Sequence, residues 1–134
     1  MNFSRALVLS ALVLDASPAL ACKPTLGSHL ATYHADREAG FDEFNTGFYV
    51  MCDCYTAGAY HNSDGGTSAY VGYSVKLGPV DLTVGVVGGY AAGPMPMVIP
   101  SVRLPVACLR LALLPPIPFA KQNTAGIHLM KDFQ

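Results

Sequence analysis

Hydrophobic and polar positions alternate with a period of two along much of this chain. Over 68–77, one face of an extended strand carries Val71, Tyr73, Val75 and Leu77, and the other face carries Tyr70, Gly72, Ser74 and Lys76. Residues 80–90 repeat the pattern, with aliphatic side chains on one face and mostly small or polar ones on the other. A strict two-residue period predicts β-strands.

The same patterns and the turn residues between them predict about eight short strands. We expect strands at 25–34, 46–51, 57–62, 68–77, 80–90, 106–114 and 126–133, with a short one at 102–104. The stretch 94–100 holds three prolines, so we expect it to be extended but only partly paired. The clearest hairpin signal is the polar, glycine-bearing corner within 60–72. Together these features predict an all-β fold, a small antiparallel up-and-down barrel.

The composition bears on whether such a barrel lies in a membrane or in water. Charged residues make up 13% of the chain, against about 25% in an ordinary globular protein. Alternation alone does not show which face of each strand points into the barrel. Apolar residues facing outward would suit a membrane barrel, whereas apolar residues facing inward would suit a soluble one. The low charge favours the membrane, whereas the second and third strands are shorter than the ~9–11 residues of a spanning strand. A net charge of −1 offers no basic patch, so we expect no nucleic-acid partner.

The N-terminal segment has the pattern of an export signal. Arg5 precedes the apolar run 6–14, and Ala19-Leu20-Ala21 matches a cleavage site. We therefore expect a signal peptide at 1–21 and a single barrel domain at 22–134, exported and placed in the outer membrane. The alternatives are a buried N-terminal helix, a periplasmic location, or a lipoprotein anchored through Cys22.

Four cysteines, Cys22, Cys52, Cys54 and Cys108, allow three pairings. An exported chain can form disulfides, so these residues are either small apolar side chains or include one long-range bridge. Metal-ligand spacings are lacking, and we expect neither a metal nor a cofactor.

Several short motifs occur in a recognisable order. They are His34 with Arg37 three residues later, Glu43-Phe44-Asn45-Thr46-Gly47, Asn62-Ser63 followed by Ser68-Ala69-Tyr70, the prolines of 94–100, Pro115 and Phe133. In this order the chain resembles the outer-membrane lipid A palmitoyltransferases, eight-stranded barrels with an interior acyl-chain pocket. It is more closely similar to short exported proteins of phages and bacteria that share these motifs. Asn62 stands where the palmitoyltransferases have an aspartate.

The resemblance implies an acyltransferase-like site with His34 as base and Ser63 as nucleophile. Asn62 would donate to the developing oxyanion, and Arg37, Glu43 and Tyr70 would contact the substrate. Alternatively, Asn62 and Ser63 are turn residues that anchor loops, and Arg37 pairs with a carboxylate of its own loop.

Two functions remain open at this point. The first is an outer-membrane barrel that transfers or hydrolyses a lipid acyl chain. The second is a non-catalytic small β-barrel that binds a hydrophobic ligand or remodels the cell envelope. For both we expect a monomer whose partner is a lipid or acyl chain.

Overall fold

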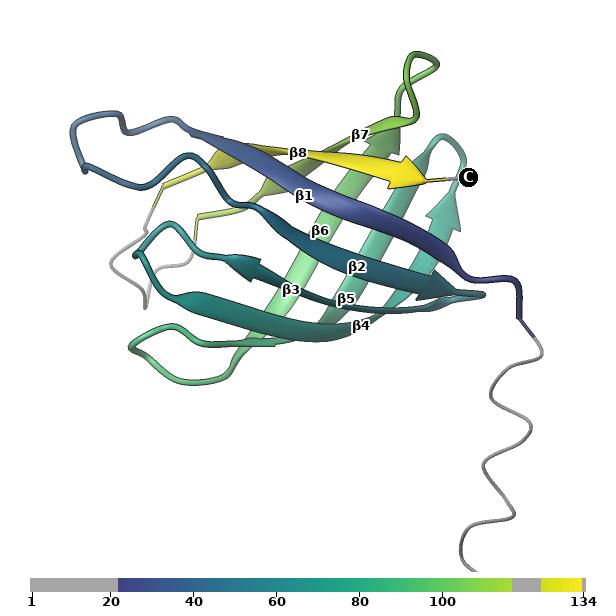
Figure 1. Cartoon of the computed structure of the whole chain (residues 1–134), viewed down its shortest axis with the longest axis horizontal. Coiled ribbons are helices and arrows are strands. Elements are labelled where there is room, and N and C mark those ends of the chain that lie inside the picture. Colours follow the sequence, from purple (N-terminus) through teal and green to yellow (C-terminus); the bar gives the residue numbers. More distant parts are fainter. Residues whose placement is uncertain (1–21, 117–123, 134) are drawn as a thin grey trace, which may run out of the picture.

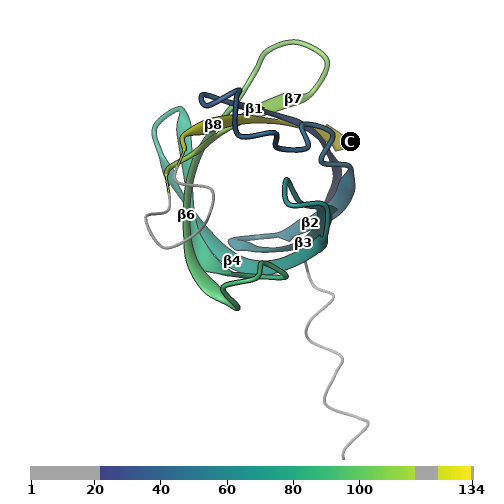
Figure 2. The same ribbon diagram turned by 90° about the vertical axis from the view of Figure 1, so that its left-hand side faces the viewer.

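The computed structural model describes residues 22–116 and 124–133, and these form a closed antiparallel barrel of eight strands (Figures 1 and 2). Each strand pairs with its sequence neighbours, and β1 pairs with β8 to close the ring. The strands are β1 (Thr25–His34), β2 (Gly47–Cys52), β3 (Tyr55–His61), β4 (Thr67–Leu77), β5 (Val80–Gly88), β6 (Met95–Arg103), β7 (Leu109–Leu114) and β8 (Gly126–Phe133). The all-β up-and-down barrel is therefore confirmed, while the expected signal peptide lies outside the described residues. No helix in the described part is long and apolar enough to cross a membrane.

The strand bounds differ from expectation mainly at β6. Strands β1 and β8 have the bounds expected from the sequence, and β2 to β5 shift by at most two residues at either end. Strand β6 is much longer than the expected 102–104 and pairs with β5 from Met95 to Val102. On its other side, Ser101, Val102 and Arg103 are the only β6 residues that pair with β7 in the described part of the chain. The proline-rich stretch therefore lacks pairing with β7, in agreement with the expected partial pairing. It is paired with β5 from Met95 onward, contrary to that expectation.

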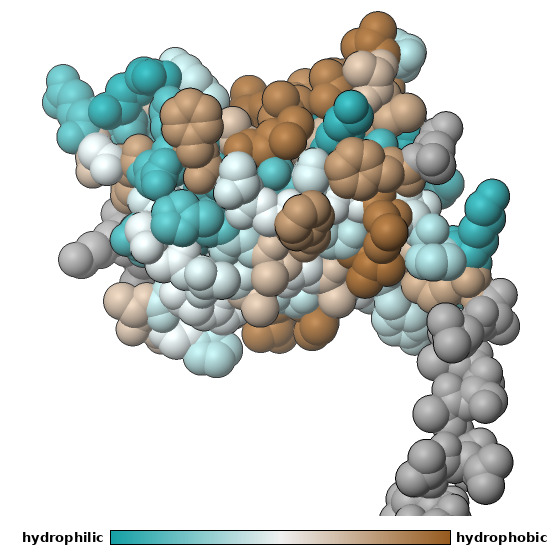
Figure 3. All heavy atoms as spheres, viewed as in Figure 1, coloured by the Kyte–Doolittle hydropathy of each residue, from teal (hydrophilic) through white to brown (hydrophobic). Residues whose placement is uncertain are grey.

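The faces of the barrel are oriented with apolar side chains outward. In the middle of four strands, Val50, Val71, Val84 and Val98 are all exposed. Polar side chains fill much of the interior, where His29, Thr56, Arg110 and His128 are buried. On the face shown in Figure 3, hydrophilic residues gather over the β1–β2 connection, and hydrophobic residues lie across the strands. The apolar faces of the strands therefore point outward, which is one of the two orientations that the alternation allowed.

Aromatic rings occupy the centre of the barrel beside the polar groups. Tyr49, Tyr70, Val87 and Met95 form the buried cluster. Gly58 makes room for one of these rings, because a Cβ there would lie 2.7 Å from Tyr70. A glycine in a strand interior is characteristic of such a close approach.

The two ends of the barrel differ. One end, which we call the loop end, carries the connections 35–46, 62–66 and 89–94. The other, the turn end, carries the short connections 53–54, 78–79 and 104–108, and β1 begins and β8 ends there (Figure 1). His34 and the corner after β3 both fall at the loop end, as the up-and-down topology requires.

A disulfide joins Cys22 to Cys52, whereas Cys54 and Cys108 are free. The antiparallel pairing of β1 with β2 sets Thr25 opposite Met51, and this brings the residues flanking the two strands together. The cysteines thus include the one long-range bridge that was an alternative from the sequence. It occupies the sulfur that a lipid anchor at Cys22 would need.

Candidate functional site

His34 and Ser63 meet at the loop end. His34 is the last residue of β1, and Ser63 lies in the corner between β3 and β4. His34 Nε2 and Ser63 Oγ are 3.1 Å apart, which is hydrogen-bond distance. The imidazole is 4% exposed and packs against the Phe41 ring, with 4.8 Å between ring centroids. The structure thus brings together the base and nucleophile expected from the sequence.

Asn62 holds the corner rather than facing the reacting groups. Its Nδ2 donates to Ser68 Oγ at 3.0 Å and to the Gly89 carbonyl at 3.1 Å. Its Oδ1 accepts from the backbone N–H groups of Asp64 and Gly66. Both amide hydrogens are therefore engaged, and none remains for a substrate oxyanion. This arrangement is contrary to the oxyanion role expected for Asn62 and matches the turn role that was its alternative.

Asn45, in the β1–β2 connection, is the amide that contacts Ser63. Its Nδ2 lies 3.3 Å from Ser63 Oγ and donates to the His61 carbonyl at 2.9 Å. The same connection is tied to the corner by the Asp42 N–H, which donates to the Ser63 carbonyl at 3.0 Å. We call His34, Asn45 and Ser63 the rim site.

Two buried polar atoms of the rim site have no hydrogen-bond partner among the described residues. They are His34 Nδ1 and Asn45 Oδ1. Asn45 is 1% exposed, so bulk solvent does not compensate. Buried polar atoms are satisfied in the great majority of cases, and those that are not often mark a functional group.

The acidic residues of the β1–β2 connection that come soon after His34 in the sequence bond to groups other than His34. Glu43 forms an ion pair with Arg37, with 3.3 Å between Arg37 Nη1 and Glu43 Oε1. Arg37 also lies over the Tyr33 ring at 4.9 Å. Asp36 Oδ1 accepts from the Glu38 N–H. Arg37 and Glu43 therefore show the loop pairing that was the alternative to substrate contact.

The rim site opens onto a cavity of about 160 Å³ inside the barrel. Tyr70, expected to contact substrate, lines this cavity, and its hydroxyl lies 3.1 Å from His29 Nε2. Tyr90, in the β5–β6 connection, lines it too, and burial raises the pKa of its phenol, so it stays protonated. The lining combines tyrosine, methionine and histidine side chains with small serines and threonines.

One side of the cavity borders the weakly paired β6–β7 region. Pro96, Met97, Val98 and Ile99 line the cavity and have no β7 partner among the described residues. Leu114, at the end of β7, lines the same region. The cavity therefore reaches a part of the wall where backbone pairing is interrupted.

A hydrogen-bonded chain of side chains crosses the barrel interior beneath the rim. His29 Nδ1 and His128 Nε2 are 2.8 Å apart, and His128 Nδ1 is 2.7 Å from Thr32 Oγ1. With the contact between His29 and Tyr70, each nitrogen of the two imidazoles has a partner. His29, Thr32 and His128 were not among the site residues expected from the sequence, although His128 falls on the inward face of β8 by its two-residue period.

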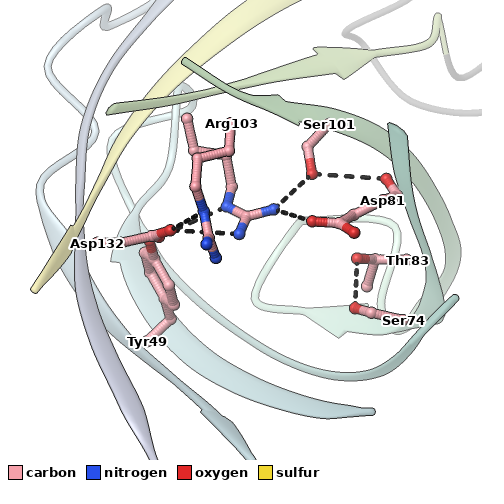
Figure 4. A network of polar contacts seen from close by, with 8 residues as sticks. Tyr49, Ser74, Asp81, Thr83, Ser101, Arg103 and Asp132 are labelled. Carbon is pink, nitrogen blue, oxygen red and sulfur yellow. Dashed lines mark hydrogen bonds and ion pairs between the residues drawn. The ribbon is translucent and has the colours of Figure 1, made fainter. Parts of the chain in front are cut away.

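Toward the turn end, a second polar cluster lies inside the barrel (Figure 4). Arg110 Nη1 lies 2.6 Å from Asp81 Oδ2 and 3.2 Å from Ser101 Oγ, and Arg110 Nη2 lies 3.2 Å from Asp132 Oδ2. Asp132 also accepts from the Tyr49 hydroxyl and pairs with Arg103. We call Tyr49, Asp81, Ser101, Arg103, Arg110 and Asp132 the ionic network.

The ionic network was missed because its members are far apart in the sequence. Arg110 interrupts the apolar run of β7, and Asp81 and Asp132 sit among apolar strand residues. The available signal for the network was a charged residue on the same face of each of several strands. Charged residues are almost never buried unless they are paired, so charges on the inward face should be partners of one another.

Only one close group of three potential metal ligands occurs among the described residues. It comprises Cys22, Cys52 and Asp53. Two of its members are joined in the disulfide, so they offer no thiolates.

Comparison with known proteins adds no identity to this geometry. No protein-family model matches the sequence, and none of the curated proteins matches it. The fold and the rim site are therefore the basis for the function proposed below.

Proposed function

We propose that the chain is an outer-membrane β-barrel whose rim site cleaves or transfers an acyl chain of a lipid ester. The distance of 3.1 Å between His34 Nε2 and Ser63 Oγ, at one end of an internal cavity, carries this proposal. A hydroxyl bonded to a buried imidazole is the arrangement that activates a serine for acyl chemistry. The resemblance to lipid A palmitoyltransferases points to the same residues.

The outer surface supports the membrane location. Exposed aromatic side chains lie near the loop end (Tyr33, Phe44, Phe48) and near the turn end (Tyr55, Tyr73, Phe133). Exposed valines lie between the two groups. Aromatic girdles around an apolar band, with longer loops at one end, are characteristic of outer-membrane barrels.

Strand length is compatible with a thin membrane. Strands β1, β4, β5 and β6 have 10, 11, 9 and 9 residues, which match the ~9–11 residues of a spanning strand. The other strands are shorter, with six residues in β2 and β7. The bacterial outer membrane is thinner than an average bilayer, which favours this location for short strands.

The proposed reaction uses one serine and one histidine. Ser63 Oγ attacks the ester carbonyl carbon while its proton passes to His34 Nε2, and a tetrahedral oxyanion forms. Collapse breaks the bond to the alcohol oxygen, which takes the proton from His34 and leaves an acyl-Ser63. Water then completes hydrolysis, or a second hydroxyl completes transfer, with His34 again carrying the proton.

The interrupted β6–β7 pairing provides a route for the acyl chain. A chain in the membrane would enter the cavity beside Pro96 to Ile99, where β6 has no described β7 partner. Met51, Met97 and Met130 line the cavity and offer flexible apolar contacts to a hydrocarbon.

Mass spectrometry of lipid A, combined with fractionation, tests the proposal. Cells that express the chain are expected to hold it in the outer membrane and to show lipid A changed by one acyl unit. Ser63→Ala and His34→Ala should abolish the change. Ser74→Ala is a matched control, because Ser74 lines the same cavity but bonds Thr83 Oγ1 at 2.7 Å, away from His34. Unchanged lipid A under strong expression, or recovery in the soluble periplasm without detergent, contradicts the proposal.

A non-catalytic barrel that binds a hydrophobic ligand would use the same cavity. That function has no need of a serine hydroxyl bonded to an imidazole, so the rim geometry favours acyl chemistry. Retention of the cellular phenotype in His34→Ala would instead support the binding function.

A further inference from the structure

The orientation of the Asn45 amide is fixed by its surroundings. Its Nδ2 faces the carbonyl oxygens of His61 at 2.9 Å and Asp42 at 3.4 Å, in addition to Ser63 Oγ. A carbonyl oxygen only accepts hydrogen bonds, so the nitrogen and not the oxygen of the amide must face this side. The amide nitrogen has two hydrogens, and its two shortest contacts are those with the His61 carbonyl and Ser63 Oγ, so Asn45 donates to Ser63.

A donor on this side determines which way the hydroxyl of Ser63 points. Ser63 Oγ accepts from Asn45 Nδ2 and has one hydrogen of its own, with His34 Nε2 at 3.1 Å. If the hydroxyl donates to His34 Nε2, Ser63 accepts one hydrogen bond from Asn45 and donates another to His34. If His34 Nε2–H donated instead, the hydroxyl hydrogen of Ser63 would have no acceptor in the rim site. The first arrangement makes more hydrogen bonds and requires His34 to carry its proton on Nδ1.

We propose that Asn45 is a positioning residue for the rim site. It directs the Ser63 proton to His34 Nε2 and so holds His34 in the tautomer that acts as a base. This inference rests on the proposed function for its catalytic meaning, while the tautomer itself is independent of any reaction. Asn45 thus does for the serine what an orienting carboxylate does for the histidine in a triad. Neither Asp36 nor Glu43, two carboxylates of the β1–β2 connection, contacts His34 Nδ1 among the described residues.

Two substitutions separate positioning from mere support of the loop. Asn45→Asp and Asn45→Leu both remove the donation to the His61 carbonyl, so both should weaken the loop. Only the carboxylate of Asn45→Asp can accept a hydrogen bond from Ser63. The hydroxyl would then turn away from His34, and His34 would move its proton to Nε2 in order to donate to Ser63.

The tautomer is measured by ¹⁵N NMR of the imidazole rings of the purified full chain in detergent micelles. We expect His34 to be protonated at Nδ1 in the wild type and at Nε2 in Asn45→Asp. In Asn45→Leu, where no amide directs the Ser63 hydrogen, we expect a mixture of the two tautomers. His61 is an internal control, since its Nε2 donates to Asp42 Oδ2 at 3.0 Å and should not change. An Nε2-protonated His34 in the wild type overturns the proposal, and so does an unchanged tautomer in Asn45→Asp.

Labelling of Ser63 by an organophosphonate gives the second readout. Loss of the general base should slow labelling in Asn45→Asp by at least about 10²-fold relative to the wild type. Asn45→Leu should react faster than Asn45→Asp. Equal slowing in both variants assigns Asn45 a structural role and overturns the proposal. A tautomer that switches as expected in a chain without lipid activity leaves this inference standing and removes the proposed function instead.

Discussion

The two polar clusters inside this barrel differ in how fully their hydrogen bonds are satisfied. In the ionic network, Arg110 is 3% exposed and Asp132 is 2% exposed, and both have several charged or hydroxyl partners. In the rim site, His34 Nδ1 and Asn45 Oδ1 are buried without a described partner. A satisfied buried network stabilises one conformation, whereas an unsatisfied one retains capacity for a ligand.

From this difference we infer that the ionic network at the turn end stabilises the fold and that the rim site at the loop end carries the chemistry. The ionic network links strands β2, β5, β6, β7 and β8 through side chains (Figure 4). The rim site is built mainly from two connections that bond to each other at the mouth of the cavity. Substitutions in the two clusters should therefore separate stability from activity.

The largest expected effect on stability comes from the ionic network. Asp132→Ala leaves Arg110 buried with one carboxylate fewer and should lower the free energy of unfolding by about 3–5 kcal/mol. Urea unfolding in detergent micelles measures this change. Arg103→Gln is the matched control, because Arg103 is about half exposed and its pair with Asp132 should contribute about 0–1 kcal/mol. Equal effects of the two substitutions would contradict the role assigned to the network.

Asn62 should behave as a structural residue although it adjoins the nucleophile. Asn62→Ala removes the side-chain bonds that close the corner and leaves buried partners such as Ser68 unsatisfied. We expect a loss of about 1–3 kcal/mol in the free energy of unfolding. Activity per folded molecule should fall much less than in Ser63→Ala. Complete inactivation with unchanged stability would place Asn62 in the catalytic machinery after all.

The smallest effect on stability is expected in the rim site itself. Ser63→Ala removes one hydroxyl from a site that is already incompletely bonded, so the free energy of unfolding should change by no more than about 1 kcal/mol. The unfolding midpoint in urea should stay close to that of the wild type. A loss comparable to that of Asp132→Ala would mean that the two clusters do not differ in function.

The sequence predicted those features that depend on local pattern. The two-residue period located β1 and β8 with the bounds observed, and the up-and-down order placed His34 and Ser63 at the same end. Asn45 was part of a recognised motif but had no assigned role, because its partners His61 and Ser63 lie 16 and 18 residues away. The bonds of Asn62 were not predicted from the sequence for the same reason, since the Gly89 carbonyl that engages its amide lies 27 residues away.

By itself, then, the sequence determined an all-β barrel of about eight strands and the residue types available at each end. Only the tertiary structure decided that the apolar faces point outward, that Cys22 pairs with Cys52, and that Arg110 is neutralised by Asp81 and Asp132. The physical reason is that periodicity fixes which side chains share a face of a strand. Ring closure fixes which face is enclosed and which distant groups must satisfy one another there.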